Sequence, residues 1–149
     1  MARINVGLAI VINFSWNKIS SLVVTSKSSI DTTCTVWNLD DMLTAVTQLI
    51  AHDREVYDIV WLPNSTDIFV SVGTDGALCA FDLWSLKHIT ILYEMPPPKN
   101  QLPTGLPPSS PLLRIVFDSG DPMYMSTFHQ DGSDVQILDM RSPGAPVME

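Results

Sequence analysis

Short runs of apolar and small residues, separated by turn-forming residues, recur along the whole chain. The pattern is clearest in residues 56–94, where the segments 56–62, 67–73, 77–83 and 88–94 alternate with the polar stretches PNST, TDG and WSLK. Valine, isoleucine, leucine and aromatic residues dominate the segments, and the apolar spacing of an amphipathic helix is not sustained anywhere. The pattern predicts an all-β protein of short antiparallel strands.

The predicted strands do not alternate cleanly between apolar and polar positions. Residues 59–61 (IVW), 68–72 (IFVSV) and 78–81 (LCAF) are apolar or small at both parities. A strand has this composition when both faces of its sheet are covered. We therefore expect each sheet to lie between neighbouring sheets.

The pattern occurs three times. Asp31 and Trp37 of the first copy correspond to Asp75 and Phe81 of the second, 44 residues later in both cases. A third copy covers 112–141. Four strands per unit and a period of about 40–45 residues are typical of a β-propeller blade. The sequence predicts about three consecutive four-stranded antiparallel blades.

The third copy is displaced by an insertion. Residues 95–111 hold seven of the eleven prolines and are predicted to form a loop between two blades. We expect this loop to emerge on the same rim as His52. The predicted blades cover about 13–50, 51–94 and 112–149, and residues 1–12 match none of them.

Charge and cysteine content narrow the functional classes. Sixteen acidic and eight basic residues give a net charge of −8, and the basic residues are not clustered. Nucleic acid and anionic membranes are therefore not expected as direct partners. The apolar run 6–12 is too short to span a bilayer.

Cys34 and Cys79 are expected to be reduced core residues that face opposite sides of adjacent blades. We expect a cytoplasmic or nuclear protein. We also expect that it binds neither a metal nor a cofactor.

The second unit resembles the WD40 repeat, with Ala51-His52 in place of Gly-His and Phe81-Asp82 in place of Trp-Asp. The resemblance implies a structural tetrad that consists of His52, Ser71, Asp75 and Phe81. The phenylalanine side chain has no N–H group. The hydrogen-bond relay of the tetrad is therefore expected to stop at the hydroxyl group of Ser71.

The other two units match the tetrad only in part. In the first unit Asp31 and Trp37 correspond to tetrad residues, whereas Lys27 falls at the hydroxyl position. Asp31 is expected in a tight turn and Trp37 at the end of a strand. The third unit keeps Asp131 at the turn position and ends in Leu138-Asp139.

Longer segments narrow the resemblance. SSIDTTCTVW, TQLIAHDREVYDI, SVGTDGALCAFDL and SPLLRIVF resemble the plant proteins called transparent testa glabra and anthocyanin eleven, and their animal cullin-ligase-associated relative. The resemblance implies a seven-bladed ring. We therefore expect a partial propeller, either a truncated product or a fragment, that can self-associate through open blade faces.

The resemblance also implies a function. It predicts a non-enzymatic scaffold whose partners are MYB and basic helix-loop-helix regulators, protein kinases or a cullin-ligase adaptor. Members of the ligase-associated group carry Trp-Asp-x-Arg, and Arg141 keeps the arginine position in the third unit while Trp84 replaces it in the second. In the alternative interpretation, Arg141 only closes its strand through a salt bridge to a nearby acid.

Two other functions stay open at this stage. His52, Ser71 and Asp75 contain the residue types of a hydrolase triad, although no Gly-x-Ser-x-Gly motif accompanies them. The chain could also be a fragment with no independent role. A further set of acids is interpreted as solvated loop charges rather than as a metal or acid–base site: Asp40, Asp41, Asp53, Glu55 and Asp58.

Overall fold

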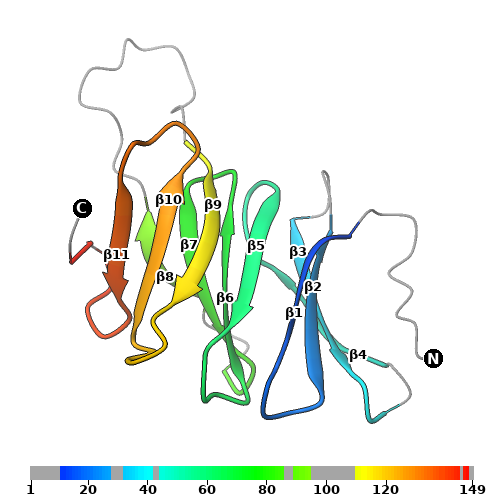
Figure 1. The fold of residues 1–149 in the computed structure, drawn as a ribbon. Coiled ribbons are helices and arrows are strands. Elements are labelled where there is room, and N and C mark those ends of the chain that lie inside the picture. Colours follow the sequence, from blue (N-terminus) through cyan, green and yellow to red (C-terminus); the bar gives the residue numbers. More distant parts are fainter. Residues whose placement is uncertain are drawn as a thin grey trace.

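The computed structural model describes residues 11–27, 32–41, 44–85, 89–94, 110–144 and 146–147. These residues form eleven strands in three antiparallel sheets (Figure 1). The part of the chain that is described contains no helix, and so no helix that could cross a membrane. The predicted all-β class is confirmed.

Each sheet follows one repeat of the sequence. The first sheet contains, in order, β1 (Val11–Trp16), β2 (Leu22–Lys27), β3 (Thr33–Asn38) and β4 (Thr44–Ile50). The second contains β5 (Val56–Trp61), β6 (Ile68–Gly73), β7 (Ala77–Asp82) and β8 (Ile89–Glu94). The third has three strands among the described residues: β9 (Leu112–Phe117), β10 (Tyr124–His129) and β11 (Val135–Asp139). The four segments predicted in residues 56–94 are therefore β5 to β8.

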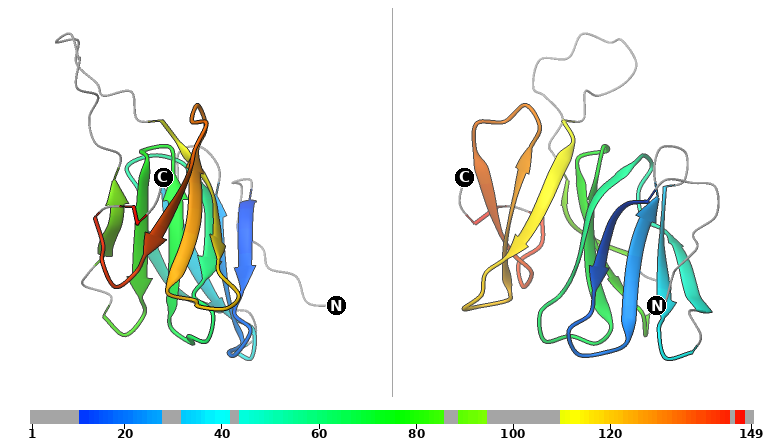
Figure 2. Two further views of the ribbon diagram at one scale, coloured as in Figure 1. Left: turned by 60° about the vertical axis from the view of Figure 1, so that its left-hand side comes forward. Right: turned by 45° about the vertical axis from the view of Figure 1, so that its right-hand side comes forward.

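The sheets stand side by side like the blades of a propeller, with β1, β5 and β9 as the neighbouring first strands (Figures 1 and 2). Two rims result. The lower rim carries the β1–β2, β5–β6 and β9–β10 turns and the ends of β3, β7 and β11. The upper rim carries His52, the β6–β7 turn and the β10–β11 turn. Residues 95–109 of the predicted insertion lie outside the described residues.

Two apolar clusters hold the three sheets together. The cluster between the first and second sheets includes Val24, Val36, Ile59, Trp61 and Phe69. The cluster between the second and third sheets includes Val70, Val72, Leu78, Leu112 and Met125. The middle sheet contributes to both, which explains why its strands are apolar at both parities. Full burial of one such large side chain stabilises the fold by about 1.5–3 kcal/mol.

The outer face of the first sheet, unlike the equivalent faces of the other two sheets, is exposed to solvent. Phe14 occupies the position that Ile59 and Ile115 occupy in the next two sheets, yet 65% of Phe14 is exposed compared with 1% and 4% for the others. Trp16 is 60% exposed, whereas its counterpart Trp61 is 5% exposed. No described sheet lies against this face.

Candidate functional site

The upper rim of the second blade holds the residues of the predicted tetrad. Nδ1 of His52 lies 2.9 and 3.0 Å from the two carboxylate oxygens of Asp75. Nε2 of His52 lies 2.8 Å from the hydroxyl oxygen of Ser71. An imidazole that donates from Nδ1 to the carboxylate accepts the hydroxyl proton at Nε2. This series of hydrogen bonds links the β4–β5 connection, the β6–β7 turn and strand β6.

Asp75 also organises its own turn. Its carboxylate accepts hydrogen bonds from the amide groups of Ala77 at 3.1 Å and Asp53 at 3.2 Å. Burial acts to raise the pKa of Asp75, but the hydrogen bonds from His52 and these amides outweigh burial and hold the pKa below its usual value. The carboxylate is therefore ionised and serves as the acceptor on which the turn depends.

A glycine makes this close packing possible. A Cβ atom added at Gly73 would lie 2.7 Å from the carbonyl oxygen of Glu55 and 3.0 Å from Cγ of His52. No side chain fits at that position unless the backbone moves. Gly73 is therefore required for the close approach of β6 to the His52 ring.

The three polar residues have the connectivity of a hydrolase triad, but the nucleophile is not accessible. Ser71 has no exposed surface, and the side chain of His52 has none either. A shallow groove beside them is lined by His52 and Asp75 but not by Ser71. A buried hydroxyl group cannot attack a substrate in solution. The geometry therefore suits a relay that ties a loop to a strand.

The fourth tetrad position extends the core instead of the relay. Phe81 is 2% exposed and stacks on Phe69, with ring centroids 4.9 Å apart and an interplanar angle of 14°. Its side chain offers no hydrogen-bond donor to Ser71. The ring stabilises the blade by packing alone.

The first blade has the hydrogen bond that the second blade lacks, between the aromatic tetrad residue and the hydroxyl group. Nε1 of Trp37 donates a hydrogen bond to Oγ1 of Thr25 at 3.0 Å. The prediction that Lys27 holds the hydroxyl position is therefore wrong. Thr25 pairs with Thr35 as Ser71 pairs with Cys79, so Thr25 is the counterpart of Ser71. The β2–β3 connection is longer than the β6–β7 connection, and a constant offset of 44 residues between the two units therefore points to the wrong residue of β2. Asp31 lies outside the described residues.

The third blade has a different arrangement. Asp131 is exposed and makes no hydrogen bond to the described residues. Thr127, at the position of Ser71, is buried and its hydroxyl group has no partner among them. His129 instead donates from Nδ1 to the carbonyl oxygen of Ser110 at 3.0 Å, while Nε2 lies 3.2 Å from the hydroxyl group of Tyr93. His129 thus joins the two strand ends that flank the predicted insertion.

One residue was misjudged from the sequence. Asp58 is 5% exposed, so it is not the solvated loop charge that the sequence suggested. Its carboxylate accepts hydrogen bonds from the side-chain amide of Asn13 and from the backbone amides of Ile59 at 3.0 Å and Ile115 at 2.9 Å. Burial raises the pKa of Asp58, against the effects of these bonds and of Arg114. The residue connects all three blades.

The sequence predicts Cys34 and Cys79 on opposite sides of adjacent blades, whereas the structure brings both into the apolar cluster between the first and second sheets. Both are buried free thiols. Burial raises the pKa of both, that of Cys79 to about 12. Such thiols are poor nucleophiles. Within the described ranges no group of three His, Cys, Asp or Glu residues could hold a metal ion.

The lower rim repeats one turn in all three blades. The residue that ends β3, β7 or β11 accepts a hydrogen bond in its side chain from the amide two positions later, at 3.0, 2.9 and 2.9 Å. The three pairs are Asn38 with Asp40, Asp82 with Trp84, and Asp139 with Arg141. Such turns hold the second residue of each pair in a fixed direction. The rim therefore presents three different side chains at equivalent places: Asp40, Trp84 and Arg141.

Arg141 is both paired and accessible. Its Nε and Nη2 atoms each donate to Asp139 at 2.8 Å, and its guanidinium carbon lies 5.1 Å from the ring centre of Tyr124. These contacts raise the pKa of Arg141 and lower that of Asp139. The side chain is still 53% exposed. The salt bridge of the alternative interpretation exists, and it orients the arginine rather than hiding it. Trp84 is 84% exposed.

Curated proteins show what the chain is similar to. It is 47% identical over 138 residues to the DDB1- and CUL4-associated factor 7 homolog of Dictyostelium discoideum, which covers 92% of this chain and 38% of that protein. It is 47% identical over 139 residues to a WD repeat-containing protein of Schizosaccharomyces pombe, covering 89% of this chain and 31% of the relative. A WD repeat-containing protein of Saccharomyces cerevisiae is 43% identical over 144 residues, covering 93% of this chain and 27% of the relative. No family profile matches the chain.

The chain therefore spans about a third of the length of these relatives. The similarity extends over most of the chain and agrees with the three consecutive antiparallel sheets. Over most of its length the chain is similar to WD repeat-containing proteins.

Proposed function

We propose that the chain acts as a scaffold in a protein complex, and that it binds a cullin-ligase adaptor through its lower rim. The observation that supports this most directly is the orientation of Arg141 by Asp139 at the rim. An arginine whose rotamer is already fixed loses little side-chain entropy when a partner binds. The name of the Dictyostelium relative points to such partners.

The two equivalent positions should contribute differently. Arg141 can add hydrogen bonds with the donors that Asp139 leaves free, whereas Trp84 offers a large apolar surface without positive charge. An adaptor that recognises arginine at each position would bind this chain weakly. An exposed tryptophan can nevertheless anchor a different partner.

Co-precipitation with the adaptor DDB1 tests this proposal. We expect weak capture by the native chain, loss of capture with Arg141→Ala and stronger capture with Trp84→Arg. Arg54→Ala, on the upper rim, is the matched control and should leave capture unchanged. Equal capture by all four proteins would remove the support for the adaptor.

The other partners implied by the family resemblance are MYB and basic helix-loop-helix regulators and protein kinases. They stay part of the proposal as alternatives on the same scaffold. A hydrolase function has no geometric support because Ser71 is buried. Hydrolytic activity that is present in the native chain and lost with Ser71→Ala would revive it.

A further inference from the structure

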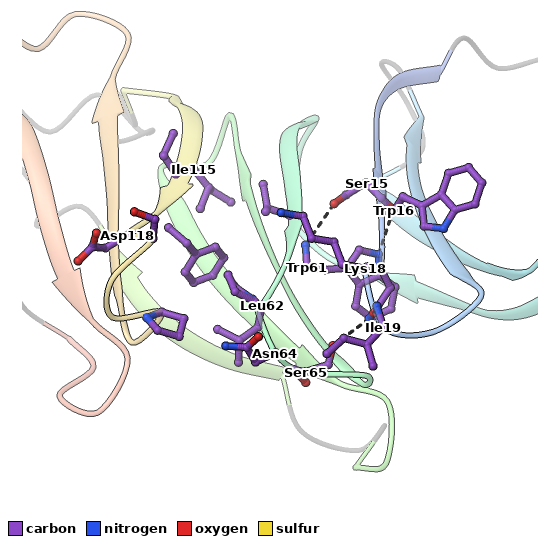
Figure 3. Close-up of a pocket in the computed structure, with 17 residues that line it drawn as sticks. Ser15, Trp16, Lys18, Ile19, Trp61, Leu62, Asn64, Ser65, Ile115 and Asp118 are labelled. Carbon is purple, nitrogen blue, oxygen red and sulfur yellow. Dashed lines mark hydrogen bonds between the residues drawn. The ribbon is translucent and has the colours of Figure 1, made fainter.

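A groove of about 500 Å³ opens on the lower rim, where the first strands of the three blades end (Figure 3). Its lining comes from the last residues of β1, β5 and β9 and from the turn that follows each strand. Leu62 lies near the middle of the view, Ile115 and Asp118 lie towards β9, and Lys18 and Ile19 lie towards β1 (Figure 3). The volume lies within the range of about 300–1,000 Å³ that is typical of ligand pockets.

The groove offers apolar surface to solvent. Its lining includes Ile19, which is 56% exposed, and Val116, which is 62% exposed. Pro63, Phe117 and Pro122 add further apolar surface. Contiguous exposed apolar surface of this kind marks interaction sites and ligand-binding grooves.

The walls of the groove are already ordered. Asn17 is 2% exposed and its Nδ2 donates to the carbonyl oxygens of Ser65 at 3.0 Å and Thr66 at 3.3 Å, across the first two blades. Its Oδ1 accepts from the amides of Ile19 at 2.9 Å and Ser20 at 3.0 Å. On the other side, Asp118 accepts from the amides of Gly120 and Asp121. A preorganised groove loses little entropy on binding.

The charge around the groove is negative. The three turns that line it carry Asp67, Asp118 and Asp121 and one cation, Lys18. Asp118 and Lys18 line the groove itself, whereas Asp67 and Asp121 belong to the same turns outside the lining. Oδ2 of Asp121 lies 3.8 Å from Nη2 of Arg141. The carboxylates of Asp67 and Asp118 instead accept hydrogen bonds from hydroxyl and amide donors within their own turns. An occupant with positive charge beside its apolar part would complement this distribution.

We propose that the groove binds an extended peptide segment of a partner protein in which one or two apolar side chains are flanked by lysine or arginine. The apolar side chains occupy the groove between Ile19 and Phe117. The flanking cations lie near Asp67 and Asp118. This assignment rests on the proposed scaffold function, and it adds a second contact surface beside Arg141 on the same rim.

Labelled octapeptides test the proposal by fluorescence polarisation with the whole 149-residue chain. The probe set has Leu, Ile, Phe or Trp at the two central positions and Lys or Arg at both ends. One control set has Asp or Glu at the ends, and a second has Ser at the centre. We expect micromolar binding of the first set only, weakening as salt is raised.

Two variants locate the binding. Ile19→Ser should weaken binding about tenfold, because the apolar contact is lost. Asp118→Asn removes the charge but keeps one oxygen that can accept from a turn amide, and it should weaken binding about threefold. The matched controls are Val46→Ser, on β4 with a similar exposure of 53%, and Asp134→Asn on the upper rim. Both controls should bind as the native chain does.

Three results would overturn the groove assignment: no binding by any peptide, a preference for acidic ends, or equal weakening by the controls. DDB1 capture is measured on the same variants. Capture that persists in Ile19→Ser while no peptide binds would reject the groove and leave the scaffold function standing. Peptide binding without DDB1 capture would reject the adaptor alone.

Discussion

The carboxylate of Asp58 accepts a hydrogen bond from the backbone amide of Ile115 at 2.9 Å, across 57 residues of sequence. The same carboxylate accepts from Asn13 in the first blade. One side chain of the middle blade thus fixes the first strands of both neighbouring blades. A buried acceptor with several donors is costly to remove, because each donor is then left without a partner.

We expect Asp58→Asn to lower the free energy of unfolding by about 1–3 kcal/mol, because the amide cannot accept both interblade bonds. The pH dependence has a defined sign. Burial raises the folded pKa of Asp58 above its usual value of 3.8, so ionisation costs stability as the pH rises from about 4 through the folded pKa. The deficit of the variant should therefore be largest near pH 4 and shrink at higher pH. Urea unfolding between pH 4 and 7 measures it, with Asp134→Asn as the control.

Asp75 should show the opposite dependence. Its folded pKa lies below 3.8, so its contribution to stability is present above that pH and is lost as the pH falls through the folded pKa. We expect Asp75→Asn to cost about 1–2 kcal/mol at pH 7 and progressively less below pH 4. The same urea series measures this, with Asp53→Asn as the exposed control. A pH-independent deficit would contradict an ionised Asp75 carboxylate in the folded state.

The relay of the first blade is tested by Thr25→Val, which keeps the side-chain shape and removes the acceptor for Trp37. We expect a loss of about 1 kcal/mol in the free energy of unfolding, since the indole N–H is left without this partner. Lys27→Met is the comparison, because a constant repeat offset places the hydroxyl position there. A larger effect of the lysine variant would contradict the Trp37–Thr25 assignment.

Gly73→Ala should destabilise the second blade. The added methyl group would lie 2.7 Å from the Glu55 carbonyl oxygen, which is backbone and cannot move without disturbing the strand. Overpacking of this kind costs about 1–3 kcal/mol. Gly120→Ala is the matched control, since the nearest atom to its added Cβ lies 3.7 Å away. Thermal unfolding of both variants should show a lower midpoint for Gly73→Ala only.

The exposed face of the first blade predicts self-association of the 149-residue chain. Phe14 and Trp16 on one copy can pack against the opposite exposed face of another, which carries Val116, Phe128 and Val135. Trp61, the counterpart of Trp16 in the second blade, makes such a contact between blades within the chain. Its Nε1 donates a hydrogen bond to the carbonyl oxygen of Ser15 in the preceding blade at 2.9 Å. We expect a mass that rises with concentration in sedimentation experiments and falls with Phe14→Ser and Trp16→Ser combined. A native chain that stays monomeric at all concentrations would refute this.

The sequence by itself determined the class, the strands and the repeats. Strand positions such as 68–73 and 77–82 could be predicted because their residues are apolar at both parities, and that composition is stable only in a sheet covered on both faces. The resemblance also placed His52, Ser71 and Asp75 in one tetrad, and the structure brings these three side chains together.

Only the tertiary structure decided which residue holds each equivalent position. Thr25 rather than Lys27 faces Trp37, because turn length shifts the strand and the strand register is set by pairing between sheet neighbours. Asp58 resembles a surface acid in the sequence, since its donors Asn13 and Ile115 are 45 and 57 residues away. The groove of the lower rim arises from three turns that come together only when the blades pack side by side.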